Sequence, residues 1–389
     1  MLRSVYLIRN LARNPARTAL TCVAVALPVM IFVLSAAVIH GINRFLDNSA
    51  RQLRLAVANK ASIVNLLPAG HRSKIESLDP THERLISVCG MRWFGGRVEG
   101  DQRPLSTLAC HHDTFTTTFP ETNLTREEED LWLRDRQALI VGSGTALQFG
   151  WKIGARATIT PSLPPYKPME FHIVAISRSK VDAITNFARL DYYNEGLRAW
   201  GIATDLVGFY FVKCASQADV EHFGRVIDEL FANSPDATQT QNEKAFMNEF
   251  ITQQFNLPRN LTILAAVTIF VAIMAAANTM SMNFRDRLGE LATLKALGFR
   301  SSLVLALIQS ESVFLCLLGG TLGALIPYVA FTHTPLREVT VPLIQHLDIR
   351  PHVCFQAVSV SLVIGILAAI WPSILAARLK VVVALRRLE

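Results

Sequence analysis

Four long apolar runs constrain the fold of this chain more than any other feature of its sequence. A helix that crosses a membrane needs about 20 mostly apolar residues. The runs that meet this requirement are residues 18–41, 261–282, 303–331 and 353–377. The first run follows several arginines, as a signal peptide would, but its apolar core exceeds the usual length of about 7–15 residues. It is therefore predicted to be an uncleaved membrane helix.

Between the first two runs lies a polar segment, residues 42–260, that is long enough to form a core of its own. The chain is 51% hydrophobic, with a mean hydropathy of +0.31. That is too apolar for a typical soluble protein and too charged for a chain that lies wholly in lipid. The sequence predicts four transmembrane α-helices and one large extracytoplasmic α+β domain.

Local patterns in this polar segment mix strands and helices. Residues 137–151 read as a strand and a short helix, and residues 155–177 as two strands joined by a proline-rich turn. Residues 206–215 read as a buried strand, and residues 216–235 place apolar side chains at helical spacing. Residues 240–257 predict another helix, which continues into the second apolar run.

Basic residues near the ends of the runs predict the orientation of the chain. Residues 1–17, 283–302 and 378–389 carry four arginines or lysines each, whereas residues 332–352 carry two. Because basic residues collect on the cytoplasmic side, both termini and residues 283–302 are expected inside. Residues 42–260 and 332–352 are then outside. The net charge of +7 reflects this topology, so nucleic-acid binding is not expected.

Residues 1–17 have a pattern of their own. Leucine, valine and isoleucine alternate with arginines, which is typical of an amphipathic helix that lies in the interface of a lipid bilayer. Asn14-Pro15 would end this helix before the first span.

Candidate metal and catalytic sites in the outer segment are weak. Residues 110–113, with the sequence CHHD, contain possible metal ligands, but adjacent side chains diverge and no further histidine follows at helical spacing. A solvated loop is favoured there, and a solvated helix start is favoured for the acidic residues 126–130. No G-x-S-x-G or nucleophile–base pair occurs, so the chain is not expected to be an enzyme by itself.

The cysteines give no zinc or thioredoxin-like motif, because no C-x-x-C occurs. Cys89, Cys110 and Cys214 lie in the outer segment. Three cysteines allow at most one disulfide among them, and its pairing is not readable from the sequence.

The sequence contains no ATP-binding motif. A P-loop, G-x-x-x-x-G-K-[ST], needs a lysine directly after a glycine, and none of the lysines here follows one. If ATP drives this protein, ATP and Mg²⁺ are expected on a separate ATPase polypeptide. No cofactor or metal is expected in this chain.

Residues 283–302 return the chain briefly to a polar environment between two spans. Phe284, Leu288, Leu291 and Leu294 form an apolar band at helical spacing, with Lys295 at its edge. Gly298 is placed to end a helix in a left-handed conformation. A rigid helix tied to two spans can transmit a push, whereas a polar loop would only keep the spans apart. Physical reasoning alone leaves both alternatives open.

The third run contains an ionisable residue, Glu311, and a cluster of glycines. Ionisable residues in spans mark function or a specific partner, and a structural or coupling role is favoured here over substrate binding. Gly319 and Gly323 form a G-x-x-x-G pattern, whose expected role is close helix packing. The pattern does not decide between packing inside one subunit and packing between two subunits.

Taken together, these residues resemble the core segment of the MacB/FtsX-like ABC transporter permeases, the type VII or mechanotransmission family. The pattern is an arginine-containing turn, a glutamate, A-x-L-K-A-L-G, a second glutamate in the next span and a glycine cluster. Its members here are Arg285, Arg287, Glu290, Ala292, Leu294, Lys295, Ala296, Leu297, Gly298, Glu311, Gly319, Gly320 and Gly323. Residues 372–386 resemble the closing pattern of the family, although Val383 stands where an acidic residue is usual.

The resemblance implies a permease subunit in the bacterial inner membrane that pairs with a second copy and binds an ATPase on the cytoplasmic side. Residues 283–302 would be the coupling helix, with Arg285, Arg287, Glu290, Leu294, Lys295, Leu297 and Gly298 at the ATPase. Glu311, Gly319, Gly320 and Gly323 would serve transmembrane packing or coupling. The outer segment is similar to a MacB-like periplasmic core domain.

Members of this family work by mechanotransmission, and they differ in what they move. Some export substrates with a periplasmic adaptor and an outer-membrane channel, and others extract lipoproteins or activate cell-wall hydrolases. The outer segment looks most similar to the efflux branch, which includes the DevC-type exporters. Export is therefore expected, with an FtsX-like regulator of a cell-wall hydrolase as the alternative.

Overall fold

The computed structural model describes residues 15–179, 183–255, 257–333 and 349–377, and these form two compact units. One unit is helical and the other, residues 42–255, is a mixed α and β domain. The expected interfacial helix of residues 1–17 lies mostly outside the described residues, as do most of the loop 332–352 and the whole tail 378–389.

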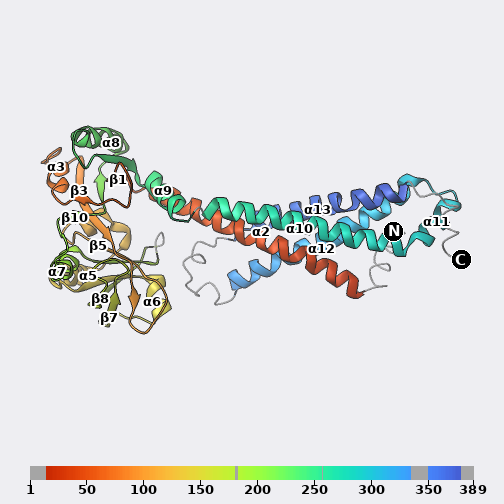
Figure 1. Ribbon diagram of the computed structural model, residues 1–389, viewed down its shortest axis with the longest axis horizontal. Coiled ribbons are helices and arrows are strands. Elements are labelled where there is room, and N and C mark those ends of the chain that lie inside the picture. The colour runs from red at the N-terminus through yellow and green to blue at the C-terminus, as the bar shows by residue number, and fades with distance from the viewer. Residues whose placement is uncertain (1–14, 180–182, 256, 334–348, 378–389) are drawn as a thin grey trace. The chain divides into compact units, whose positions relative to one another are not determined.

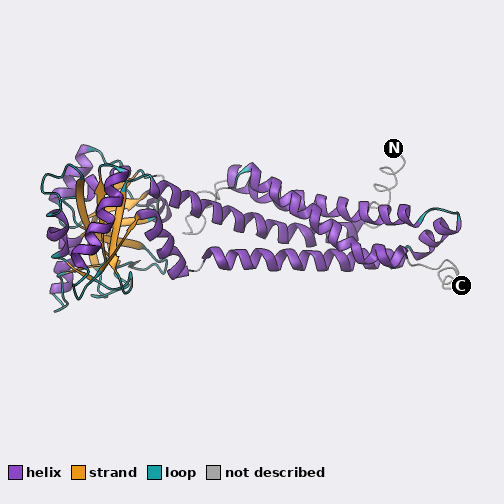
Figure 2. Cartoon of the chain, turned by 90° about the horizontal axis from the view of Figure 1, so that it is seen from above, coloured by secondary structure: helices purple, strands orange, loops and turns teal. Residues whose placement is uncertain are grey.

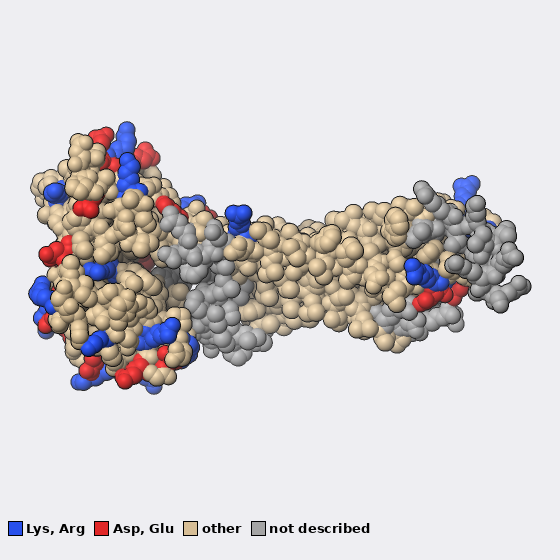
Figure 3. All heavy atoms as spheres, viewed as in Figure 1, with Lys and Arg blue, Asp and Glu red and all other residues tan. Residues whose placement is uncertain are grey.

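Four helices are long and apolar enough to cross a membrane. They are α2 (Pro15–Ala50), α10 (Leu257–Asp286), α12 (Ser301–His333) and α13 (Pro351–Ala377). Each contains one of the four apolar runs. On the face drawn in Figure 3, the surface of this unit is almost free of charged side chains between its ends. The expectation of four membrane helices is confirmed, and the chain fits a membrane protein.

Small side chains bring these helices together. Val25 and Val29 of α2, Ala272 and Ala276 of α10, and Ala357 of α13 belong to one buried cluster. Because lipid tails are as apolar as the helices, close packing rather than the hydrophobic effect has to hold such a unit together. The small residues allow that close approach.

Helix α2 continues nine residues beyond the expected span, which ended at Gly41. The extension contains no proline or glycine after residue 41 that would break it. Ile42 and Leu46 lie one turn apart and are both only 5% exposed. An amphipathic continuation of the helix is therefore buried, and the polar sequence that ends the apolar run does not end the helix.

The outer domain is built on one mixed sheet of ten strands, in the order β12-β1-β11-β3-β5-β9-β6-β8-β7-β4 (Figure 1). Strands β5 and β9 pair in parallel, as do β6 and β8, and the other pairs are antiparallel. A separate two-stranded sheet joins β2 to β10. The strands are β1 (Arg54–Asn59), β2 (Leu67–Pro68), β3 (Leu85–Trp93), β4 (Arg97–Val98), β5 (Ser106–Cys110), β6 (Ala138–Gly142), β7 (Arg156–Thr160), β8 (Met169–Ser177), β9 (Thr185–Arg189), β10 (Leu206–Val207), β11 (Phe209–Cys214) and β12 (Thr238–Asn242).

Both faces of the large sheet are buried, because its central strands are apolar on both sides. In β1, Leu55 and Val57 belong to one core cluster, while Ala56 and Ala58 belong to a second. The alternation follows from the two-residue period of a strand. A sheet of this kind needs helices on both faces, and Figure 2 shows the strands flanked by helices.

The covering helices each bury an apolar stripe. Ile75, Tyr193 and Phe223 of α3, α7 and α8 join the first cluster. Phe115 and Trp132 of α4 and α5 join the second, as does Phe246 of α9. The helical elements of the domain are α3 (His71–Glu76), α4 (Phe115–Thr118), η1 (Pro120–Thr122), α5 (Arg126–Arg134), α6 (Ser143–Phe149), α7 (Leu190–Arg198), α8 (Gln217–Phe231) and α9 (Glu243–Phe255).

Most of the local predictions for this domain are confirmed. The strand and short helix of residues 137–151 are β6 and α6, and the amphipathic helix is α8. The helix start predicted at residues 126–130 is the first turn of α5, where Thr125 and Glu128 form a capping box, but Glu128 is buried rather than solvated. One boundary is wrong: residues 240–242 belong to β12, because they pair with β1, and α9 begins only at Glu243.

The loop predicted at residues 110–113 is a turn that follows β5, but it is only partly solvated. Cys110 is fully buried, and the Nδ1 atom of His111 accepts a hydrogen bond of 2.9 Å from the backbone N–H of Gly90. The indole of Trp132 donates to the carbonyl of His112 at 3.0 Å. This segment therefore joins the sheet to α5, and its histidines are half-buried.

The three cysteines of the outer domain are buried free thiols. Burial raises the pKa of Cys89 and of Cys214 to about 12, and raises the pKa of Cys110 well above its ordinary value. Thiols with such high pKa values are mostly protonated at neutral pH and react slowly. Their role here is packing.

Acid should destabilise the outer domain through His111. Burial, with Arg72 nearby, lowers the pKa of His111 to about 4, below an unfolded value of about 6.5. The neutral ring stabilises the fold fully above about pH 6.5, and this contribution is lost as the pH falls toward 4. Thermal unfolding of the protein between pH 7 and pH 4 should show an extra loss on the order of 2–3 kcal/mol relative to His111→Asn, whose amide oxygen can accept the same hydrogen bond without titrating.

The matched control is His222→Asn, because His222 is exposed on α8. It should leave the pH profile unchanged. A profile of His111→Asn that parallels that of the unmodified protein would show that this ring does not contribute.

Candidate functional site

The charged segment between the second and third spans forms a short helix, but not the single helix expected over residues 283–302. Helix α10 runs on to Asp286, and a separate helix α11 (Leu288–Ala296) precedes α12. The break falls at Arg287, whose backbone leaves the helical conformation at φ −108° and ψ 13°. This break lets Phe284 of α10 and Leu288 of α11 both pack against α12, where they meet Val304 and Ile308.

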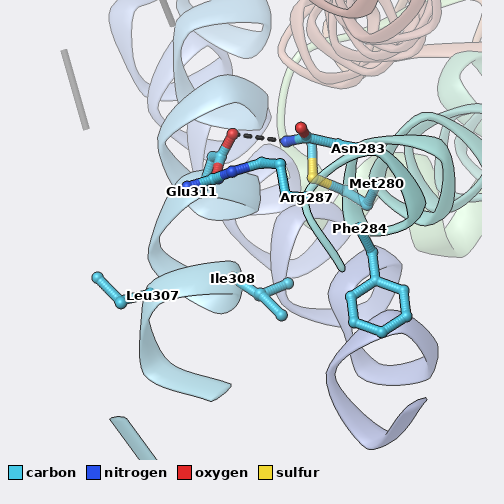
Figure 4. A pocket seen from close by; sticks show the side chains of 7 residues that line it. All are labelled: Met280, Asn283, Phe284, Arg287, Leu307, Ile308 and Glu311. Atoms are coloured by element: carbon cyan, nitrogen blue, oxygen red, sulfur yellow. Dashed lines mark hydrogen bonds and ion pairs between the residues drawn. The ribbon is translucent and has the colours of Figure 1, made fainter. Parts of the chain in front are cut away.

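An ion-pair network at the break connects α10, α11 and α12. The carboxylate of Glu311 accepts hydrogen bonds from the amide of Asn283 at 2.6 Å and from the guanidinium of Arg287 at 2.9 Å. Arg287 also pairs with Glu290 at 3.2 Å. Figure 4 shows Asn283 and Arg287 reaching the carboxylate of Glu311 from one side. One arginine thus bridges a glutamate of α11 and a glutamate of α12.

The bridge is mostly shielded from solvent, with Glu311 8% and Arg287 14% exposed. Beneath it lies a small hollow lined by Met280, Asn283, Phe284, Arg287, Leu307, Ile308 and Glu311 (Figure 4). Because a shielded carboxylate without a partner is costly, Glu311 needs Arg287 and Asn283 in place. Glu311 thus pairs with residues at the junction of α10 and α11, whereas Gln309 donates to the Ile366 carbonyl of α13.

The far end of α11 remains exposed. Gly298 has a φ of +90°, the left-handed conformation expected of a glycine that ends a helix. Next to it, Leu297 is 71% and Phe299 45% exposed. Arg285 is exposed and Lys295 half-buried, and Leu294 lies in α11 with its side chain outside the described residues. The structure does not bring these predicted site residues into one cluster.

The glycines of α12 pack inside one subunit. A Cβ atom on Gly319 would lie 2.8 Å from the carbonyl oxygen of Cys22, and one on Gly323 would lie 2.4 Å from that of Ala26. Both contacts are with α2. Gly320 faces α13 instead, where a Cβ would meet Ser361. The G-x-x-x-G pattern is therefore filled by α2 of the same chain.

The residue that sequence reasoning missed is Asn283. It lies one helical turn before Arg287, so both reach the same side of the chain. A polar amide directly after the apolar run 261–282 was a signal that the sequence offered. In the described part of the chain, no group of three or more His, Cys, Asp or Glu could hold a metal ion. What the arrangement can do is hold the short helix rigidly against α12.

The segment that contains this ion-pair network matches a known protein family. Residues 262–381 match the family model for the FtsX-like permease C-terminal domain. An uncharacterized ABC transporter permease of Methanocaldococcus jannaschii is 21% identical over 345 residues, which are 82% of this chain and 80% of that protein. Residues 262–381 thus match the FtsX-like permeases, and the chain as a whole is similar to the MacB/FtsX-like ABC transporter permeases.

Other relatives of this permease are longer proteins. The macrolide export ATP-binding/permease protein MacB of Syntrophobacter fumaroxidans is 26% identical over 174 residues, or 44% of the permease and 24% of that protein. The MacB 1 protein of Yersinia pestis bv. Antiqua is 32% identical over 127 residues, or 33% of the permease and 19% of that protein. The permease therefore spans about a quarter or less of the MacB relatives that it matches.

Two solved structures resemble the permease weakly. The periplasmic region of MacB from Actinobacillus actinomycetemcomitans covers 52% of the permease at 10% identity and a TM-score of 0.34. The extracellular domain of the transporter YknZ from Gram-positive bacteria covers 49% at 10% identity and a TM-score of 0.33. At these scores the likeness supports no argument.

The Arg287–Glu311 bridge should be measurable as an energetic coupling. Arg287→Met leaves the shielded carboxylate of Glu311 without its counter-charge, and Glu311→Gln leaves Arg287 with Glu290 alone, whereas the double variant leaves neither charge of the bridge. Urea or thermal unfolding in detergent should therefore show a double variant less destabilised than the sum of the single variants, by about 1–3 kcal/mol. The matched pair Arg156→Met and Glu170→Gln, on exposed β-strand positions, should be additive to within about 0.5 kcal/mol. Additive effects at Arg287 and Glu311 would show that the bridge holds nothing together.

Proposed function

We propose that this permease couples ATP hydrolysis by a separate ATPase subunit to movement of its extracytoplasmic domain. The observation that carries the proposal is the bridge from Arg287 to Glu290 and Glu311, with the exposed Leu297 at the other end of α11. A helix that is fixed to the spans at one end and exposes apolar side chains at the other is suited to receive a push from a partner. The polar-spacer alternative needs neither feature.

The proposed orientation follows from the distribution of basic residues, which is four in each of three segments and two in the loop 332–352. It places α11 and both termini in the cytoplasm and the domain of residues 42–255 in the periplasm. The proposed location is the bacterial inner membrane. ATP and Mg²⁺ would be bound by the ATPase subunit, because none of the lysines of the permease follows a glycine as a P-loop requires.

The proposed task is export of a periplasmic or membrane-derived substrate by mechanotransmission, without passage of the substrate between the spans. The MacB relatives are named as macrolide export proteins, and this supports efflux as the class of activity. We further propose that two copies pair, as a homodimer, and that a periplasmic adaptor and an outer-membrane channel complete the pathway. Copurification of a cell-wall hydrolase in place of an adaptor would contradict export.

The exposed end of α11 should be the ATPase contact. Leu297→Asp places a charge where an apolar contact is proposed, so the ATPase should no longer copurify with the permease. Val64→Asp is the matched control, because Val64 is 69% exposed in the outer domain, close to the 71% of Leu297. The control should retain the ATPase. Equal recovery of the ATPase with both variants would remove α11 as the docking helix.

Variants of α11 should separate binding of the ATPase from coupling of ATP hydrolysis to the permease. Glu290→Gln weakens the pair with Arg287, and Gly298→Val forces a β-branched side chain into a left-handed conformation. Both variants should insert in the membrane and retain the ATPase, while the rate of ATP hydrolysis loses its dependence on the permease. Normal coupled rates in both variants would exclude this role for α11.

A further inference from the structure

The chain enters and leaves the outer domain through two adjacent strands. Helix α2 leads into β1, and β12 leads into α9, which is followed by α10 after residue 256. Strands β1 and β12 pair with each other, with Leu55 opposite Asn242. The two connections therefore join the sheet at neighbouring strands, side by side.

A buried ion pair joins these two connections. Arg54, the first residue of β1, donates to both carboxylate oxygens of Glu243, the first residue of α9, at 2.6 and 3.0 Å. The same guanidinium donates to Glu121 at 2.6 Å and to the carbonyl of Thr118 at 2.8 Å. It also lies 4.2 Å from the centre of the Phe119 ring. All three nitrogens of this guanidinium therefore donate a hydrogen bond, to Glu243, Glu121 and the carbonyl of Thr118.

The free energy of unfolding alone does not explain why Arg54 and Glu243 are buried as an ion pair. The side chains of Arg54 and Glu243 are 2% and 6% exposed. Removing two charges from water is costly, and a well-packed apolar pair often stabilises a fold equally well. What a two-point guanidinium–carboxylate contact adds is a fixed geometry. Here that geometry sets the register between the first turn of α9 and the start of β1.

Neighbouring contacts fix the other side of the same junction. Leu53 has a φ of +53°, a conformation that a branched side chain adopts at a cost. Its carbonyl accepts from the N–H of Cys214 at 2.9 Å, which holds the strained turn in place. Near the end of α2, Asp47 pairs with Lys244 of α9 at 2.7 Å. Contacts inside the outer domain therefore hold both the start of β1 and the end of α2.

We propose that Arg54 and Glu243 are positioning residues of the transport cycle, forming an ionic joint that locks the two connections into one body. A displacement of α2 and α10 then moves the whole outer domain, instead of being absorbed by rotation of one connection against the other. This inference rests on the proposed function, because it requires that ATP drive such a displacement. It names the residues through which the displacement reaches the domain.

The test uses the intact complex of permease and copurified ATPase in lipid nanodiscs. Nitroxide labels at Val64→Cys and Leu322→Cys, both exposed positions, report the distance between outer domain and spans with and without a non-hydrolysable ATP analogue. Glu243→Gln removes the charge from the joint. Glu128→Gln is the matched control, because Glu128 is 7% exposed and makes the same two-point contact, with Arg178, elsewhere in the domain.

A second variant separates positioning from stability. Arg54→Met combined with Glu243→Met replaces the pair by apolar side chains and leaves, of the three charges, only that of Glu121, which is 19% exposed. With this double variant and with Glu243→Gln, the complex should hydrolyse ATP while the nucleotide-dependent change in distance is lost. The unmodified joint and Glu128→Gln should both show the change.

The possible results distinguish a failure of the ionic joint from a failure of the proposed function. Retention of the distance change in the double variant overturns the joint, because the charges are then dispensable for transmission. Loss of the change in Glu128→Gln as well overturns it too, because any buried carboxylate would then suffice. A distance that never changes with nucleotide in the unmodified protein instead overturns the proposed function, and the inference with it.

Discussion

The ion pair between Arg287 and Glu311 is the contact on which the position of α11 depends. Glu311 lies in an apolar helix, where a charge without a partner is costly. Its two partners come from the end of α10, so satisfying Glu311 fixes where α10 stops and α11 begins. Arg287 then holds Glu290 as well, which ties the short helix to both spans. One electrostatic requirement therefore decides the position of the element proposed to meet the ATPase.

The outer domain also uses a buried ion pair to fix a helix against a neighbouring element. Its sheet is buried on both faces by helices, so its body is rigid, and the chain enters and leaves through neighbouring strands. There again a buried arginine pairs with a glutamate at a junction between elements. In both places an ion pair fixes the angle between a helix and the element it meets, where apolar packing alone would permit sliding.

Much of this structure could be predicted from the sequence because its strongest signals are local. Apolar runs of about 20 residues identify membrane helices, and helical spacing in residues 216–231 identifies α8. The break at Arg287 could not be predicted, because it depends on Glu311, which is distant in sequence. For the same reason the half-buried position of His111 was missed: it depends on Gly90, in a strand that composition does not place beside it. The partner of Gly319 and Gly323 likewise required the packing of α2.

We propose that α11 and α12 move together when ATP binds to the ATPase. Hydrogen exchange of the permease–ATPase complex, with and without a non-hydrolysable ATP analogue, tests it most directly. Amides of α11 and amides of α12 near Glu311 should change their protection from exchange together when the nucleotide is added. In Arg287→Met, the change should be lost in α12 alone. A change in α11 that leaves the amides around Glu311 unaffected in the unmodified protein would contradict the account.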